Sequence, residues 1–72
     1  MEIHTDAIKA GWNIVVHDDL LATGGTAVAA SKLVQRLGGN ITSFLFILEL
    51  SFLDGRTRLF DYSKSIKSLV KY

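Results

Sequence analysis

The sequence contains no cysteine and no proline, and its charges nearly cancel. The lack of cysteine excludes disulfide bonds, thiolate zinc sites and a cysteine nucleophile, and it fits a reducing compartment such as the cytoplasm. Eight basic against seven acidic residues give a net charge of +1, which provides no broad field for nucleic acid or for an anionic membrane. We therefore expect no nucleic-acid partner, and any charge-based function must be local.

Long apolar runs are also missing, although hydrophobic residues make up 49% of the 72 residues. The longest run, at 44–48, is far shorter than the roughly 20 residues that a membrane-spanning helix needs. Residues 1–6 have neither the basic start nor the apolar core of a signal peptide. We expect a cytoplasmic chain without a membrane partner, forming a single domain over residues 1–72 with a thin core.

Hydrophobic patterning predicts a strand, a helix and a second strand. Residues 12–16 and 41–50 are apolar with little alternation, which is typical of strands covered on both faces. Between them, apolar residues recur at three- and four-residue spacing over 27–37, as in an amphipathic helix that Gly38 and Gly39 end. This order predicts a right-handed parallel crossover and an α/β fold.

The last third of the chain has weaker patterns. Residues 51–58 are typical of a loop with an Asp54-Gly55 turn, and residues 65–70 of a weak edge strand. We interpret the basic residues here as a solvated face, since no aromatic interleaving or basic excess accompanies them. They are Arg56, Arg58, Lys64, Lys67 and Lys71. A two-strand parallel core would leave apolar faces uncovered, so we also expect self-association.

Acidic, threonine and glycine residues gather in an expected loop over residues 17–26, between the first predicted strand and the helix. The residues are Asp18, Asp19, Thr23, Gly24, Gly25 and Thr26. Ligands of open α/β sheets bind beyond the carboxyl ends of the strands. Glycine amides, threonine hydroxyls and a helix N-terminus favour a phosphate, whereas two carboxylates favour sugar hydroxyls or Mg²⁺ held through water. A sugar phosphate satisfies both halves of the pattern.

Simpler interpretations exist for each part of this pattern. An Asp-Asp pair after a strand is more often a solvated turn, a Gly-Gly pair a tight turn, and Thr23 or Thr26 an ordinary helix cap. The combination favours a site, and it matches neither a Walker A loop nor a dinucleotide fingerprint. His4 and His17 have no third ligand at metal spacing, so we assign no protein metal site.

The segment Ile-Val-Val-His-Asp-Asp-Leu-Leu-Ala-Thr-Gly-Gly-Thr at 14–26 resembles the phosphoribosyl-pyrophosphate motif of type I phosphoribosyltransferases. Its Asp-Asp-Leu-Leu-Ala-Thr-Gly-Gly-Thr part resembles the form found in adenine phosphoribosyltransferase. Further segments at 2–9, 37–39, 48–50 and 52–56 extend the resemblance over nearly the whole chain. The resemblance implies a partial Rossmann-like type I phosphoribosyltransferase core.

The resemblance also implies roles for individual residues. Asp18 and Asp19 would hold the ribose 2′- and 3′-hydroxyls, and Ala22 through Thr26 would wrap the 5′-phosphate. Glu49 and Leu50 would lie at the adenine ring, although Glu49 alone fits a surface carboxylate nearly as well and Leu50 a core leucine. The implied reaction is purine salvage, in which adenine and phosphoribosyl pyrophosphate give AMP and pyrophosphate, with Mg²⁺ bound mainly through the pyrophosphate. No residue is assigned as catalytic.

The chain departs from the family in two respects. Ala10-Gly11-Trp12-Asn13 replaces the usual Pro-Gly, polar residue and Arg, and His17 replaces an aliphatic residue. The family's N-terminal hood, basic loop and flap have no counterpart, so we expect a C-terminal, phosphoribosyl-pyrophosphate-binding portion that is inactive alone and pairs with an N-terminal segment or forms a homo-oligomer. The alternative is a non-catalytic phosphate- or nucleotide-binding or structural α/β module that pairs with another chain.

Overall fold

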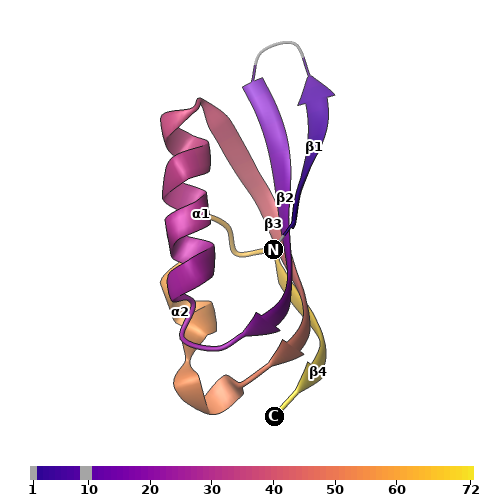
Figure 1. Cartoon of the computed structure of the whole chain (residues 1–72), viewed down its shortest axis with the longest axis vertical. Helices are drawn as coiled ribbons and strands as arrows, with labels where there is room; N and C mark the ends of the chain where they lie inside the picture. Colours follow the sequence, from indigo (N-terminus) through magenta and orange to yellow (C-terminus); the bar gives the residue numbers. More distant parts are fainter. Residues whose placement is uncertain (1, 9–10) are drawn as a thin grey trace.

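The chain forms a four-stranded sheet with its helices on one side (Figure 1). The computed structural model describes residues 2–8 and 11–72. For residues 2 and 4–8 it describes the backbone alone. Its elements are β1 (Glu2–Ile8), β2 (Gly11–Leu21), α1 (Gly25–Arg36), β3 (Gly39–Glu49), the 3₁₀ turn η1 (Ser51–Leu53), α2 (Gly55–Leu59) and β4 (Ile66–Lys71). The strands lie in the order β1-β2-β3-β4, with β1 antiparallel to β2 and the other neighbours parallel. The predicted α/β fold with a parallel strand-helix-strand unit is confirmed.

Strand β2 is longer than the sequence suggested. Pairing with β3 continues through Asp18, opposite Phe46, to Leu21, opposite Glu49, so the strand does not end at residue 16. The expected loop over 17–26 is therefore wrong in its first half, and the irregular segment shrinks to residues 22–24. Hydrogen bonding to β3 holds this stretch extended, although a pair of aspartates is a poor local strand signal.

Glycines flank helix α1 at both of its ends. Gly24 takes the N-cap position with φ = 86°, so the predicted threonine cap is wrong, and no side chain makes the capping bond. Glycine suits this position because a left-handed backbone imposes no penalty on a residue without Cβ. At the other end Gly38, with φ = 85°, follows the last turn, as predicted.

The segment between β3 and β4 is helical, which corrects the expected loop over 51–58. The turn η1 leads into α2, and Asp54 between them has φ = 53°. The Thr57 hydroxyl donates to the Asp54 carboxylate at 2.7 Å and closes the first turn of α2. Beyond it, β4 forms the predicted edge strand next to β3. Strand β1, by contrast, was not predicted, and the interpretation of His4 falls on a side chain outside the described residues.

The core lies between the sheet and the two helices, which pack on the same face (Figure 1). Its residues are Ile14, Val16, Leu21, Ala27, Val34, Ile41, Phe44, Phe46, Leu59 and Ile66. Within the described residues no element covers the other face, where Ile47 is 55% exposed. Burial of both faces is therefore wrong for this chain, because both crossovers place their helices on one side. None of the described helices is long and apolar enough to cross a membrane.

Candidate functional site

A cavity of about 220 Å³ opens at the carboxyl end of β2, and we call it the loop cavity. Its lining consists of Asp18, Leu20, Leu21, Ala22, Thr23, Gly24, Gly25, Thr26, Ala27 and Phe46. All five residues expected to wrap a phosphate line it, together with one of the two aspartates. The place is the one that open parallel sheets use for ligands, between a strand end and the start of the following helix.

The loop at 22–26 is shaped by its backbone. The Gly25 amide donates to the Thr23 hydroxyl at 3.4 Å, and the Val28 amide donates to the Gly24 carbonyl at 2.8 Å, which starts the hydrogen bonding of α1. The first amides of a helix have no acceptor within the helix, and the aligned peptides add a partial positive charge. The lining of the loop cavity therefore combines glycine backbone with a positive helix end, which suits an anion.

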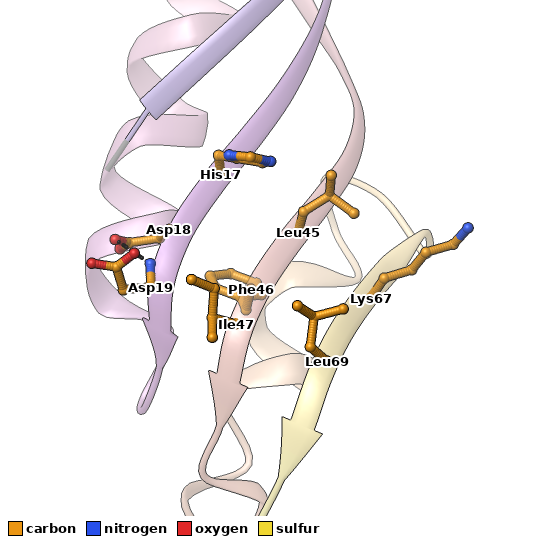
Figure 2. A pocket seen from close by; sticks show the side chains of 8 residues that line it. All are labelled: His17, Asp18, Asp19, Leu45, Phe46, Ile47, Lys67 and Leu69. Atoms are coloured by element: carbon orange, nitrogen blue, oxygen red, sulfur yellow. Dashed lines mark hydrogen bonds between the residues drawn. The ribbon is translucent and has the colours of Figure 1, made fainter.

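Of the two neighbouring aspartates, only one borders the loop cavity. Asp18 is partly buried and lines the loop cavity, whereas Asp19 is exposed and does not. The Asp19 amide donates to Asp18 Oδ1 at 2.9 Å, which holds the two residues together (Figure 2). The described pairing of β1 with β2 reaches only His17, so both aspartates lie beyond it. The structure thus brings Asp18 to the loop and leaves Asp19 at its margin.

A second hollow, of about 410 Å³, lies on the face of the sheet without helices, and we call it the open-face hollow. Figure 2 shows its floor of Leu45, Ile47 and Leu69, with Lys67 on β4 and His17 on β2 at its sides. Asp18 and Asp19 border it as well, so Asp18 is common to both concavities. This hollow has an apolar floor on the sheet, whereas the loop cavity is bordered by the glycine and threonine residues of the 22–26 loop.

Glu49, expected at a base pocket, is buried in an ionic cluster. Arg56 Nε donates to Glu49 Oε2 at 3.1 Å and Arg56 Nη2 donates to Oε1 at 2.7 Å. The Ser68 hydroxyl donates to the same Oε1 at 2.7 Å. The hydrogen bond from Arg56 lowers the pKa of Glu49, against an opposing effect of burial, and the bond to Glu49 raises the pKa of Arg56. Because its pKa lies below the usual value, the Glu49 carboxylate is ionised at neutral pH, and Arg56 and Ser68 engage both of its oxygens.

The role of Arg56 was not predicted from the sequence, from which we expected it on a solvated face. Besides Glu49 it binds the Ile66 carbonyl through Nη1 at 2.8 Å, so it joins α2 to the ends of β3 and β4. Arg58, assigned to the same face, donates from Nη1 to the Thr23 carbonyl at 3.1 Å. The solvated-face interpretation is therefore wrong for Arg56, whereas Arg58 is exposed as predicted although it makes this bond. No local pattern marks them, because their partners lie on other elements.

The backbone of Leu50 lies close to the loop at 22–26. Its amide donates to the Leu21 carbonyl at 2.9 Å, one residue before the loop begins. Neither Leu50 nor Glu49 is among the residues that line the two concavities described above. The assignment of both to an adenine ring stays a prediction. Among the described residues, no three His, Cys, Asp or Glu side chains group closely enough to hold a metal ion.

Comparisons with known sequences and with known structures relate this chain to the same group of enzymes, although no protein-family model matches the chain. All 72 residues align with the adenine phosphoribosyltransferase of Koribacter versatilis at 56% identity, covering 38% of that protein. The same enzyme from Alkaliphilus metalliredigens is 54% identical over the same span, which is 41% of its length. The chain thus spans about two fifths of these curated relatives.

Solved structures agree with the sequence comparison. The adenine phosphoribosyltransferase of Thermoanaerobacter pseudethanolicus superposes with a TM-score of 0.81 at 52% identity, over 93% of this chain and 39% of that one. The Trypanosoma brucei enzyme, in complex with AMP, pyrophosphate and ribose-5-phosphate, gives 0.75 at 28% identity, over 89% of this chain and 30% of that one. Over its full length, this chain is a homologue of part of the adenine phosphoribosyltransferases, with the α/β fold of that part.

Proposed function

We propose that this chain binds the ribose 5-phosphate part of phosphoribosyl pyrophosphate, as the C-terminal portion of a longer adenine phosphoribosyltransferase. The loop cavity carries the proposal, because the Asp18 carboxylate and the whole 22–26 loop surround one space at the start of α1. Glycine amides and the helix end attract a phosphate, while the carboxylate accepts hydrogen bonds from sugar hydroxyls. The ribose-5-phosphate bound to the Trypanosoma brucei relative supports the same ligand class.

The size of the loop cavity limits what it can hold. Pockets that enclose a drug-sized ligand measure roughly 300–1,000 Å³, and the loop cavity measures about 220 Å³. It therefore suits a phosphate and part of a sugar, with the purine outside. Leu50 is the better placed of the two base-site candidates, because its backbone reaches Leu21 while the Glu49 carboxylate is engaged by Arg56.

In the longer protein, the reaction would transfer the 5-phosphoribosyl group from pyrophosphate to adenine. Residues 1–72 would form one unit that holds the sugar and its phosphate still, which lowers the barrier by fixing the reacting carbon in place. The base site and the pyrophosphate grip would come from polypeptide outside these residues, in the same longer chain or in an oligomer. We expect no turnover of adenine and phosphoribosyl pyrophosphate by this chain alone.

Magnesium enters the proposal through the substrate. Family resemblance implies an ion bound mainly to pyrophosphate, and the described residues offer no group of three ligands that would hold it independently. Asp18 is the described carboxylate closest to such a substrate, since it lines the loop cavity. A carboxylate there can accept a hydrogen bond from water coordinated to the ion.

Calorimetric titration with ribose 5-phosphate and, separately, with inorganic phosphate tests the proposal. Asp18→Asn together with Asp19→Asn is expected to weaken ribose 5-phosphate binding about tenfold or more, because hydrogen bonds to a charged acceptor contribute roughly 1.5–3 kcal/mol. Binding of inorganic phosphate should survive the double change, since the loop is untouched. Asp61→Asn, which removes an equivalent exposed charge on the loop after α2, serves as the control.

The single variants sharpen the experiment. Asp18→Asn should account for most of the loss, because only Asp18 borders the loop cavity. Equal binding of ribose 5-phosphate by the double variant and the unsubstituted chain would remove the ribose assignment. Failure of the unsubstituted, folded chain to bind either ligand would remove the phosphate assignment as well.

A further inference from the structure

The loop at 22–26 rests directly on the backbone of α2. A Cβ added at Gly55 would overlap the Ala22 carbonyl oxygen and come within 2.8 Å of the Gly24 nitrogen. Conversely, a Cβ at Gly24 would lie 2.8 Å from the Gly55 carbonyl oxygen. Real Cβ atoms do not approach backbone atoms so closely, so both positions need glycine for the contact. Gly24, with φ = 86°, needs it for its backbone conformation as well. The two segments therefore touch, although they are about thirty residues apart in the sequence.

Arg58 adds a directed bond to this contact. Its Nη1 donates to the Thr23 carbonyl at 3.1 Å, in the middle of the loop. The same nitrogen lies 3.9 Å from the position that a Cβ would take on Gly25. Because the carbonyl and the amide of one trans peptide point in opposite directions, fixing the Thr23 carbonyl also fixes the direction of the Gly24 amide. Arg58 thus sets the orientation of one loop amide without occupying the loop cavity.

Helix α2 is itself firmly held. Leu59 is fully buried in the core, and Arg56 binds both the Glu49 carboxylate and the Ile66 carbonyl. The Thr57 hydroxyl bonds to Asp54 at its start. A short helix with these attachments to the sheet can act as a rigid support, whereas a free turn could not.

We propose that Arg58 is a positioning residue for the loop, with Gly55 as the surface on which the loop rests. Arg58 and Gly55 hold the loop in its ligand-binding shape before a phosphate arrives, so that binding does not have to order the loop. The order of the loop is a property of the free chain, whereas its effect on affinity rests on the function proposed above. The two parts are measured separately.

The first measurement needs no ligand. Backbone ¹⁵N relaxation of residues 22–26 is compared in the unsubstituted chain, Arg58→Ala, Arg58→Lys and the control Arg36→Ala. Arg36 is an exposed arginine in the last turn of α1, at the end away from the loop. We expect lower heteronuclear NOE values for the loop in Arg58→Ala only, partial recovery in Arg58→Lys, which keeps one donor for the Thr23 carbonyl, and no change in Arg36→Ala.

The second measurement titrates the same four proteins with inorganic phosphate and with ribose 5-phosphate. We expect Arg58→Ala to weaken both ligands about fivefold, the scale of one charge-assisted hydrogen bond reduced by the exposure of Arg58. A charge that merely attracted phosphate would be replaced fully by lysine and would leave loop order unchanged in Arg58→Ala. Full rescue by lysine with an unchanged loop would therefore overturn the proposal.

Gly55→Ala provides an independent variant, because it disturbs the contact without changing charge. We expect a displaced loop, seen as amide shift changes over 22–26, and phosphate binding weakened at least as much as in Arg58→Ala. If it does not fold, the Arg58 variants still decide the question. An unsubstituted chain that binds neither ligand overturns the proposed function, while the relaxation comparison still shows whether Arg58 orders the loop.

Discussion

Replacing Arg56 with alanine is expected to destabilise the fold by about 2–4 kcal/mol. Arg56 donates three hydrogen bonds, two to the Glu49 carboxylate and one to the Ile66 carbonyl. After the change, the Glu49 side chain, 5% exposed, would keep only Ser68 as a donor among the contacts described. The loss is therefore mainly the cost of a buried charge without its partner, rather than the value of the ion pair itself.

The magnitude follows from the exposure of the pair. Breaking a fully buried ion pair costs about 3–5 kcal/mol. The Arg56 side chain is 25% exposed, so water can partly replace it, and we reduce the expectation accordingly. A chain of 72 residues has a total stability of roughly 4–11 kcal/mol. Arg56→Ala would thus remove a large share of the folding free energy.

Urea denaturation followed by circular dichroism measures the change, with Arg36→Ala as the matched control. Removal of that exposed arginine should shift the free energy of unfolding by less than about 0.5 kcal/mol. Replacing both Glu49 and Arg56 with leucine should cost less than the two single leucine variants added together, because no unpaired charge is left buried. An Arg56→Ala chain within about 0.5 kcal/mol of the unsubstituted one would refute the reasoning.

The other predictions concern pH and association. Because Arg56 lowers the pKa of Glu49 below 4.5, the folded chain binds that proton less tightly than the unfolded chain. The stabilisation is complete above the unfolded-state pKa and is lost as the pH falls through the lower folded-state value. The gap between the urea midpoints of the unsubstituted chain and Glu49→Gln should therefore be largest at neutral pH and should narrow as the pH falls below 4.5. A gap that stays constant would argue against this assignment. Light scattering should give a mass above one chain, and Ile47→Lys with Leu69→Lys should reduce it, since both side chains lie on the uncovered face; a monomeric unsubstituted chain would contradict this.

The strand-helix-strand unit could be predicted because its signals are local. Apolar spacing over 27–37 and two glycines after it define α1 without any knowledge of the rest of the fold. The boundary of β2 was harder, because Asp18 and Asp19 are typical of turns and only pairing with β3 keeps them in the strand. Strand β1 depends even more on its partner. Its sequence has no clear alternation, and its register is set entirely by β2.

In the candidate site, too, residues with local sequence signals could be predicted, whereas residues that depend on distant contacts could not. The loop at 22–26 and Asp18 could be found from their sequence, because glycines and carboxylates are needed there for local reasons. The supporting residues could not, since Gly55 is required by a loop far away in the sequence. Its Asp-Gly signal predicts a turn, which is present, but gives no hint of the contact with Gly24. Arg56 and Arg58 likewise find partners that no helical or strand spacing would pair.

The expectation that both faces of the sheet are buried was wrong, although the apolar pattern on which it was based is present. The run at 44–48 lacks alternation, yet Phe44 and Phe46 are buried under the helices while Ile47 is 55% exposed. A strand of this composition is typical of burial on both faces, and the helices of this chain supply only one cover. Exposed apolar area costs about 25 cal/mol per Å², so the outward-facing residues gain stability only when a second layer is present. The apolar pattern of β3 is therefore typical of a strand covered on both faces, and the described residues of this chain cover one of them.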